Sequence, residues 1–271
     1  MASFYICPTP IGNLNDISTR LIKVLSDVDI VYAEDTRVAK KLLSHLNLKK
    51  ELHSYFKGNE IEKISEVLNL LKEDKSIAMI SDAGTPLISD PGNMLIKELI
   101  KEKIQIVSIP GPSSVLVALT LSGFDIDKFT FFGFVPKAGR ERSYFYKTIS
   151  ELAHPLVCFT SPKRLKKDLE DFVKNNLENQ VVVCRELTKK FESIYRGNAQ
   201  ELLNDIPTEE YRGEITLVID KTKNKSAIDI NIEELAKKLI VYEVPKREIA
   251  KIISSLNNEK VNKIYDSIKN L

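Results

Sequence analysis

Apolar and polar residues alternate with two different periods along the first part of the chain. Four runs are short, continuous and apolar, as expected of buried strands: residues 3–7, 28–33, 77–81 and 104–109. Between them, residues 60–73 repeat apolar residues at helical spacing, and Asp16 is placed to cap another helix. This alternation predicts right-handed βαβ units and a mostly parallel sheet. In such sheets ligands bind beyond the carboxyl ends of the strands, so we expect the chemistry in the loops there.

The second half of the chain has a different pattern. Further strands are predicted between helices rich in Lys and Glu: residues 129–134, 155–159, 180–187 and 213–219. Two prolines and a glycine break the chain at IPGPSS, and the run KTKNKSA after Asp220 is typical of a linker. Two short amphipathic helices around an Asn-Asn turn are predicted in the tail. We therefore expect two α/β domains, residues 1–112 and 113–222, and a linker with a helical tail at 223–271.

Composition narrows the class of protein. The chain has 271 residues, of which 43% are hydrophobic and 29% charged, which excludes disorder as the dominant state and allows two domains with cores of their own. A net charge of +2 does not indicate a polycation, so any contact with nucleic acid must come from a local patch. Cys7, Cys158 and Cys184 lie far apart in apolar runs, as reduced thiols in buried strands do.

The N-terminus lacks a basic region and meets two prolines before any long apolar stretch. No run of about 18 apolar residues is present to span a bilayer. These features predict a cytoplasmic protein with no membrane partner.

The densest group of turn-forming residues is ISDAGTPLISDPG, residues 80–92, directly after a predicted strand. Gly84 frees the backbone to approach a ligand, and Pro86 drives Thr85 toward an extended shape. A loop of this kind presents amides and carbonyls to a ligand. It contains neither the Gly-Lys-Ser/Thr of a phosphate loop nor the GxGxxG of a dinucleotide site.

Three further predicted strands end in polar, turn-forming segments: TPIGNLNDIS (9–18), AEDTR (33–37) and IPGPSS (109–114). Glu34, Asp35 and Arg37 fit a ligand site, and they equally fit a helix start with a local ion pair. Ser113 and Ser114 fit the N-terminal cap of the next helix, which is compatible with ligand contact. Four polar strand ends together favour a ligand site at one edge of the sheet.

Seven segments in order resemble one known family: TPIGNL, AEDTR, SDAGTPLISDPG, IPGPSS, FFGFVPK, FTSPKRL and CRELTKKFE. The chain resembles the small-subunit ribosomal RNA cytidine 2′-O-methyltransferases, of the tetrapyrrole-methylase-like class, from Tyr5 to about Ile219. The resemblance implies two α/β domains of tetrapyrrole-methylase type with a cleft between them that holds S-adenosyl-L-methionine. It also implies a homodimer that methylates the ribose 2′-hydroxyl of a cytidine in 16S ribosomal RNA near the decoding centre, as naked RNA or in the assembled small subunit.

Matched residue by residue, the resemblance implies these cofactor contacts: Pro8, Thr9, Ser81, Asp82, Ala83, Gly84, Ile88, Ser113, Ser114, Phe159, Thr160, Leu187, Gly213, Glu214 and Ile215. One segment departs from the family, because Phe56 and Gly58 stand where its members read two histidines, so no histidine role carries over there. The remaining histidines, His45, His53 and His154, are isolated in sequence and are expected in solvent or in the core.

Methyl transfer to a ribose hydroxyl is an in-line displacement and requires a general base to take the hydroxyl proton. The candidates are acidic residues at strand ends, or lysines if burial lowers the pKa: Glu34, Asp35, Asp82, Lys189 and Lys190. Candidate RNA contacts are basic or aromatic. Five gather at residues 137–147, namely Lys137, Arg140, Arg142, Tyr144 and Lys147, and two lie elsewhere in the sequence, Arg37 and Arg164. Many of the other lysines would simply solvate helix surfaces.

Other functions stay open from the residues. One is methylation of a tetrapyrrole or another small acceptor on the same fold, against which AEDTR and the basic, aromatic segment argue. Another is a non-catalytic RNA-binding protein that retains the cleft. A metal-dependent hydrolase using Asp35, Asp82 and Asp90 is disfavoured, because no spacing matches a metal-ligand set, and no metal is expected.

Overall fold

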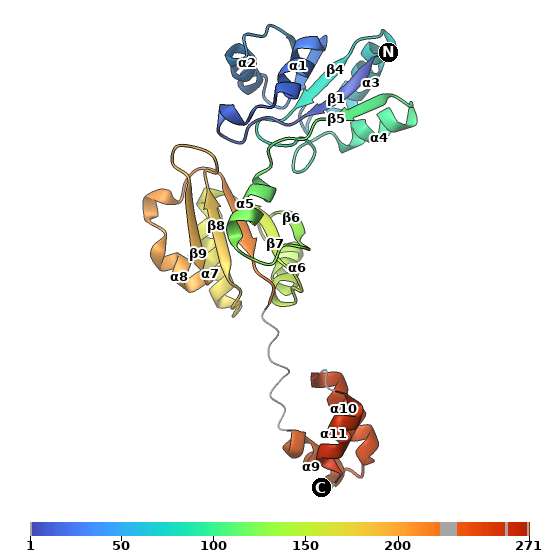
Figure 1. The fold of residues 1–271 in the computed structure, drawn as a ribbon, viewed down its shortest axis with the longest axis vertical. Helices are drawn as coiled ribbons and strands as arrows, with labels where there is room; N and C mark the ends of the chain where they lie inside the picture. The colour runs from blue at the N-terminus through green and yellow to red at the C-terminus, as the bar shows by residue number, and fades with distance from the viewer. Residues whose placement is uncertain (1, 223–231, 258–259, 270) are drawn as a thin grey trace. The chain divides into compact units, whose positions relative to one another are not determined.

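The computed structural model describes residues 2–222, 232–257, 260–269 and 271. The chain divides into two compact units, residues 1–220 and 221–271 (Figure 1). The strands described form two five-stranded sheets, both within the first unit. The predicted α/β class with a helical tail is confirmed.

The first sheet is entirely parallel, with the order β3-β2-β4-β1-β5. Its strands are β1 (Ser3–Cys7), β2 (Ile30–Ala33), β3 (Glu51–Ser54), β4 (Ile77–Ile80) and β5 (Gln105–Ser108). The helices between them are α1 (Thr19–Asp27), α2 (Thr36–His45), α3 (Glu60–Lys72) and α4 (Asn93–Lys101), with a 3-10 turn at Leu14–Asp16.

Helices cover both faces of this sheet. Along β4, Ala78 and Ile80 pack in a core with α1 and α2, whereas Ile77 and Met79 pack on the opposite face with α3 and α4. Burial on both faces explains why the central strands are continuous apolar runs in the sequence. The edge strand β3, Glu51–Ser54, is partly exposed and carries polar residues, so the apolar pattern did not predict it.

The second sheet is mixed, with the order β6-β7-β10-β8-β9. Its strands are β6 (Thr130–Phe134), β7 (Leu156–Thr160), β8 (Val181–Arg185), β9 (Ser193–Gly197) and β10 (Ile215–Ile219). β6 and β7 are parallel, and the other pairs are antiparallel. α5 (Ser114–Ser122) covers one face, whereas α6 (Gly139–Ser150), α7 (Pro162–Lys174) and α8 (Ala199–Asp205) share a core with the other face, and a 3-10 turn spans Thr208–Glu210. The edge strand β9, like β3, was not predicted.

The predicted cap at Asp16 is wrong. Ser18 is the N-cap of α1, and its hydroxyl accepts a hydrogen bond from the N–H of Leu21 at 3.1 Å. Asp16 lies in the preceding 3-10 turn, because the chain becomes extended at Ile17 before the helix begins. The three cysteines are buried and free, as predicted.

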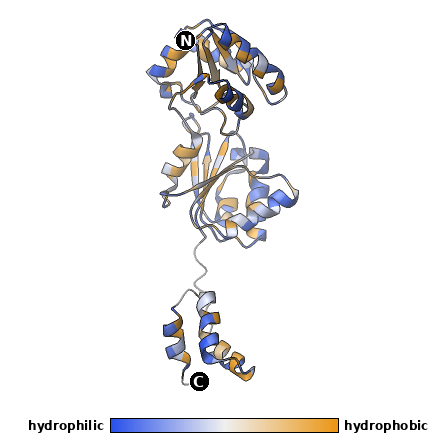
Figure 2. Cartoon of the chain, turned by 90° about the vertical axis from the view of Figure 1, so that its right-hand side faces the viewer, coloured by the Kyte–Doolittle hydropathy of each residue, from blue (hydrophilic) through white to orange (hydrophobic). Residues whose placement is uncertain are grey.

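The second unit contains α9 (Ile232–Val241), α10 (Lys246–Asn257) and α11 (Val261–Ile268). These helices carry both hydrophobic and hydrophilic residues (Figure 2), and they pack around a core of their own: Ala236, Ile249, Ala250, Ile253, Ile264 and Ile268. The two predicted tail helices are confirmed, and α9 was not predicted. Most of the predicted linker, and part of the Asn-Asn turn, lie outside the described residues.

Candidate active site

The loops that follow β1 and β4 are joined by a short antiparallel bridge. Thr9 and Gly84 exchange two backbone hydrogen bonds, with N···O distances of 2.9 and 3.0 Å. The Thr9 hydroxyl donates to the carbonyl of Ser81 at 3.0 Å, and the Ser81 hydroxyl donates to the carbonyl of Gly84 at 2.9 Å. Gly84 has a φ of +82°, which favours glycine. Thr9 and Ser81, both expected to contact a cofactor, are buried and use their hydroxyls to hold the loops together.

The loop before α5 closes on the same structure. The Thr85 hydroxyl donates to the carbonyl of Pro112 at 3.0 Å. Pro8 is buried so tightly against Gly111 that a Cβ on Gly111 would lie 2.6 Å from the Cβ of Pro8. Pro8 is not among the residues that line the cleft described next, and its contact with a cofactor stays a prediction.

A cleft of about 480 Å³ lies at these strand ends and draws residues from both sheets of the first unit. It brings together many of the expected cofactor contacts: Asp82, Ala83, Ser114, Phe159, Thr160, Leu187, Gly213, Glu214 and Ile215. An adjoining hollow of about 70 Å³ shares Ala83, Ser114 and Phe159 and adds Gly84, Ile88 and Ser113. Ser113 is also the N-cap of α5, as the sequence allowed, although its side chain makes no capping hydrogen bond.

The cleft also contains residues that the sequence did not single out for it, among them Ile11, Ser89, Asp90 and Phe134. Phe134 is 60% exposed, and its ring centroid lies 5.4 Å from that of Phe159. The sequence could have indicated Phe134 as a cleft residue, because Phe134 stands at the end of a predicted strand, where ligands bind. Asp90 lies in the SDPG turn of the loop after β4, which was already the predicted ligand loop.

Four carboxylates line this cleft. Glu214 is paired with Lys189 at 3.1 Å. The other three are Glu34, Asp82 and Asp90. Burial raises the pKa of each of these three, and each also experiences a neighbouring carboxylate that acts in the same direction. Asp82 accepts one hydrogen bond, from the N–H of Asp35 at 3.1 Å, which acts to lower its pKa. Among the described residues, none of the three forms an ion pair with a basic side chain. The cleft therefore holds negative charge that a cation would neutralise.

Asp35 differs from its neighbour Glu34. It is the N-cap of α2, and its carboxylate accepts from the N–H of Arg37 at 2.8 Å and from the Arg37 guanidinium at 2.6 Å. These hydrogen bonds lower the pKa of Asp35 to about 2. Helix start and local ion pair are thus the correct interpretation of Asp35, which is a weak base, whereas the Arg37 side chain remains exposed despite the pair.

Lys189 is also unsuited to take a proton. Burial acts to lower its pKa, but hydrogen bonds to Glu186 at 2.9 Å and to Glu214 at 3.1 Å outweigh burial, and the pKa is raised. The expectation of a basic Lys189 is therefore wrong, because the amine stays charged. Lys190 is exposed, its Nζ lies 5.6 Å from the ring centroid of Phe191, and it is not among the cleft residues.

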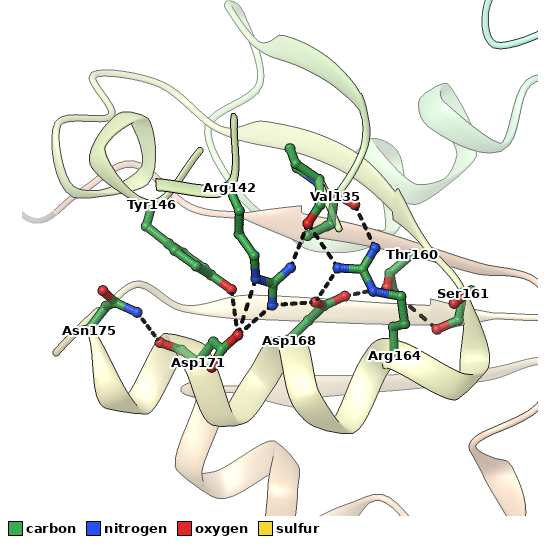
Figure 3. Close-up of polar contacts among 10 residues, drawn as sticks. Val135, Arg142, Tyr146, Thr160, Ser161, Arg164, Asp168, Asp171 and Asn175 are labelled. Carbon is green, nitrogen blue, oxygen red and sulfur yellow. Dashed lines mark hydrogen bonds and ion pairs between the residues drawn. The ribbon is translucent and has the colours of Figure 1, made fainter. Parts of the chain in front are cut away.

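Arg142 was expected to contact RNA, but it lies inside the protein in a cluster of polar contacts (Figure 3). It is only 8% exposed, and its guanidinium donates to Asp168 at 2.8 Å, to Asp171 at 2.6 Å and to the carbonyl of Pro136 at 2.7 Å. These partners occupy its donors inside the protein, so Arg142 cannot also bind phosphate.

Arg164 lies in the same cluster and is likewise structural. Its guanidinium donates to the carbonyls of Val135 at 3.1 Å and Pro136 at 2.8 Å. Asp168, fully buried, also accepts a hydrogen bond from the hydroxyl of Thr160, a cleft residue. The cluster of Arg142, Arg164, Asp168 and Asp171 therefore supports one wall of the cleft from behind.

The other expected RNA contacts lie on the surface. Lys137, Arg140 and Lys147 are exposed, and Tyr144 is 64% exposed. The Arg37 side chain is 87% exposed despite its ion pair. Arg140 and Tyr144 line a shallow hollow with Phe132 and Phe134, which links this surface to the mouth of the cleft.

Within the described residues, no helix is long and apolar enough to cross a membrane. The same residues contain no group of three or more His, Cys, Asp or Glu side chains placed to hold a metal ion.

The chain matches the family Tetrapyrrole (Corrin/Porphyrin) Methylases over residues 3–203. It is 40% identical to "Ribosomal RNA small subunit methyltransferase I" of Thermotoga maritima over 219 residues, which are 81% of this chain and 98% of that protein. It is 37% identical to the protein of the same name from Escherichia coli O157:H7, over 96% of this chain and 92% of that one.

Solved structures share the fold at low sequence identity. A uroporphyrin-III C-methyltransferase from Thermus thermophilus has a TM-score of 0.59 at 17% identity, covering 82% of this chain and 96% of its own. A diphthine synthase has a TM-score of 0.64 at 14% identity, covering 81% and 90%. The chain thus belongs to the tetrapyrrole methylase family and, within it, groups with the proteins named ribosomal RNA small subunit methyltransferase I.

Proposed function

We propose that this protein is an S-adenosylmethionine-dependent methyltransferase that methylates the ribose 2′-hydroxyl of a cytidine in 16S ribosomal RNA, near the decoding centre. The observation that carries the proposal is the cleft at the strand ends, with Glu34, Asp82 and Asp90 unneutralised by any described basic side chain. The relatives named for ribosomal RNA methylation support the choice of substrate.

The cleft residues fit the proposed cofactor. When bound, S-adenosylmethionine supplies a methyl group on a positively charged sulfur. The carboxylates of Asp82 and its neighbours would stabilise that charge, since they have no described ion-pair partner and lie in a partly desolvated site. Phe159 and Leu187 offer apolar surface for the adenine, and Gly213 and Ile215 bring backbone groups to the cleft.

Removal of the hydroxyl proton falls to Asp82 or Glu34. Both line the cleft, and burial raises the pKa of both, which makes either a better base than an exposed carboxylate. Asp35 is excluded by its lowered pKa, and Lys189 by its charge. Holding the ribose in line with the transferred methyl supplies the rest of the catalysis.

The exposed basic and aromatic residues are the proposed RNA-binding surface: Arg37, Lys137, Arg140, Tyr144 and Lys147. We propose further that residues 1–112 and 113–222 act as the two domains that flank the cleft, and that the protein works as a cytoplasmic homodimer. Sedimentation velocity of the purified chain tests the dimer, because a single monomeric species at micromolar concentration contradicts it.

The function is tested by transfer of a labelled methyl group to three acceptors: assembled small subunits, naked ribosomal RNA and a tetrapyrrole. We expect label in RNA, in an alkali-resistant dinucleotide, because methylation of the 2′-hydroxyl blocks hydrolysis at that linkage. Label in the tetrapyrrole alone would instead assign the protein to small-molecule methylation. Absence of label from all three acceptors would leave the non-catalytic alternative.

A further inference from the structure

A second pocket, here called the α2 pocket, lies beside the cleft. It has a volume of about 180 Å³ and is enclosed by the loop after β1, one face of α2 and the end of β4. Its walls are largely apolar and include Leu14, Val38 and Leu42. Asp82 lines both the α2 pocket and the cleft, so the two cavities share one carboxylate.

We propose that the α2 pocket receives the pyrimidine base of the acceptor nucleotide, turned out of its RNA stack, with the ribose at Asp82 where the pocket meets the cleft. This inference rests on the proposed function and names the subsite that selects the base. Enzymes that act on a nucleotide within structured RNA or DNA commonly extrude it into a closely fitting pocket with apolar walls.

The size of the α2 pocket fits one pyrimidine. An apolar cavity of about 150 Å³ binds one benzene ring, so a pocket of about 180 Å³ is on the scale of a single substituted ring. The cleft is much larger, at about 480 Å³, as a nucleoside with an amino-acid chain requires. The smaller cavity therefore matches the size of a base, and the larger one matches the size of the proposed cofactor.

The pocket surface has the chemistry of a base-binding site. The hydroxyls of Thr9 and Ser81, which also line it, already donate to backbone carbonyls, so the walls present chiefly carbon. At the mouth, Leu14 is 43% exposed and Val38 is 37% exposed, and a stacked base would cover both. Apolar side chains beside a polar rim are typical of a ligand pocket.

Charge at the rim fits the same occupant. Lys41 lines the pocket, is exposed and forms no ion pair with any other residue in the described ranges. An ammonium in this position would bind the phosphate of the nucleotide whose base enters the pocket. Asp82 lines both the pocket and the cleft and is therefore placed to accept a proton from the ribose.

The test fills the mouth of the pocket and follows cofactor binding and methyl transfer separately. Val38→Phe places a ring in the mouth, and Ile22→Phe is the matched control, because Ile22 on α1 is also 37% exposed and lies outside the pocket. For Val38→Phe we expect methyl transfer to small subunits, as kcat/KM, to fall at least about 30-fold. Its affinity for S-adenosylmethionine, by calorimetry, should stay within about twofold, and Ile22→Phe should match the wild type in both.

Base selection gives a second readout. On small subunits that carry each of the four bases at the acceptor position, the wild type should prefer pyrimidines to purines by about tenfold or more. Val38→Ala, which widens the mouth, should reduce that preference. If Val38→Phe fails to fold, Leu14→Trp fills the same mouth from a loop and replaces it in the assay.

Normal transfer by Val38→Phe, or a base preference that Val38→Ala leaves unchanged, would overturn the pocket assignment. In that case a loss of methyl transfer confined to Phe134→Ala would place the base beside Phe134 instead. Failure of the wild type to label any RNA would contradict the proposed function itself, which separates the two claims.

Discussion

Two groups of carboxylates in the first unit have opposite surroundings. Asp168 is fully buried and accepts hydrogen bonds from Arg142, Arg164 and Thr160. Glu34, Asp82 and Asp90 are only partly desolvated, yet among the described residues no basic side chain pairs with them. Charges that a fold buries for structure need partners, whereas charges kept for a ligand are left without them. Asp168 therefore belongs to the cluster that supports the cleft wall, and the other three carboxylates belong to the reactive cleft.

The largest effect is expected from removing the proton acceptor. Asp82→Asn or Glu34→Gln, whichever is the base, should lower kcat by about 10² to 10⁴-fold, because a positioned general base contributes that much. The kcat of the other variant should fall far less. Single-turnover methyl transfer measures the chemical step, and equal, small losses for both variants would contradict a carboxylate base.

The same carboxylates predict the pH dependence of the reaction. A base must be deprotonated to act, and burial raises the pKa of Glu34 and Asp82, so activity should be low in acid and rise as pH increases through the raised pKa. The acidic limb of the kcat profile should therefore lie above the pH at which an exposed carboxylate titrates, about 4. A profile that stays flat through this range would show that no carboxylate with a raised pKa takes part.

Breaking the supporting cluster should lower the free energy of unfolding rather than remove a group that takes part in the reaction. Arg142→Met leaves Asp168 buried without its main partner, and the free energy of unfolding should fall by about 3 to 5 kcal/mol. Arg140→Met, two residues earlier and exposed, is the control and should change stability by no more than about 0.5 kcal/mol. Urea unfolding measures both, and equal effects would remove the distinction drawn between these arginines.

A smaller effect is expected at the RNA surface. Arg140→Ala with Lys147→Ala should weaken RNA binding and reduce the slope of log affinity against log salt by about two, one for each phosphate that the variant no longer neutralises. Affinity for S-adenosylmethionine should not change. Lys174→Ala, an exposed residue at the end of α7, serves as control. If Lys174→Ala lowers the slope as much, the patch has no special role.

The smallest effect concerns His53. The sequence predicted an isolated histidine, but in the structure His53 has two carboxylate partners. Burial acts to lower its pKa, but hydrogen bonds to Glu51 and Glu66 outweigh burial and raise it. A raised pKa in the folded state stabilises the protein below the unfolded pKa, and this stabilisation is lost as pH rises through the folded pKa. The stability advantage of wild type over His53→Gln should therefore be larger near pH 5.5 than near pH 8, which lie about one unit below and about one and a half units above the ordinary histidine pKa. A pH-independent difference in urea unfolding would contradict this.

The fold and the strand-end loops of the first sheet were predictable from local signals, whereas the individual cofactor contacts, above all those from the second sheet, were implied by the family resemblance. Buried strands are apolar runs, and the loops that form the cleft are dense in Gly, Pro and Asp. Arg142 was misassigned because the sequence around it is basic and aromatic, while its partner Asp168 lies 26 residues away on another helix. Lys189 has one partner that is near in sequence, Glu186, and a second, Glu214, that comes from a distant strand end. Only the fold shows that both hydrogen-bond to its amine.

The α2 pocket was not predictable for a related reason. Its walls come from three segments that only the parallel sheet brings together: the loop after β1, α2 and the end of β4. None of its apolar residues differs, in sequence, from a residue that packs a helix on a sheet. Sequence pattern therefore identifies where a chain can bind a ligand, and tertiary contacts decide which charged residues remain available to do so.

The most direct test of the account is calorimetric titration of S-adenosylmethionine into the wild type and into Ala83→Trp. Ala83 is exposed and lines both the cleft and the adjoining hollow, so an indole there should obstruct the cleft, whereas Ala153→Trp, exposed and outside it, should not. We predict one site per chain in the wild type and in Ala153→Trp, with affinity at least about tenfold weaker in Ala83→Trp. Absence of binding by the wild type, or undiminished binding by Ala83→Trp, would contradict the assignment of the cleft.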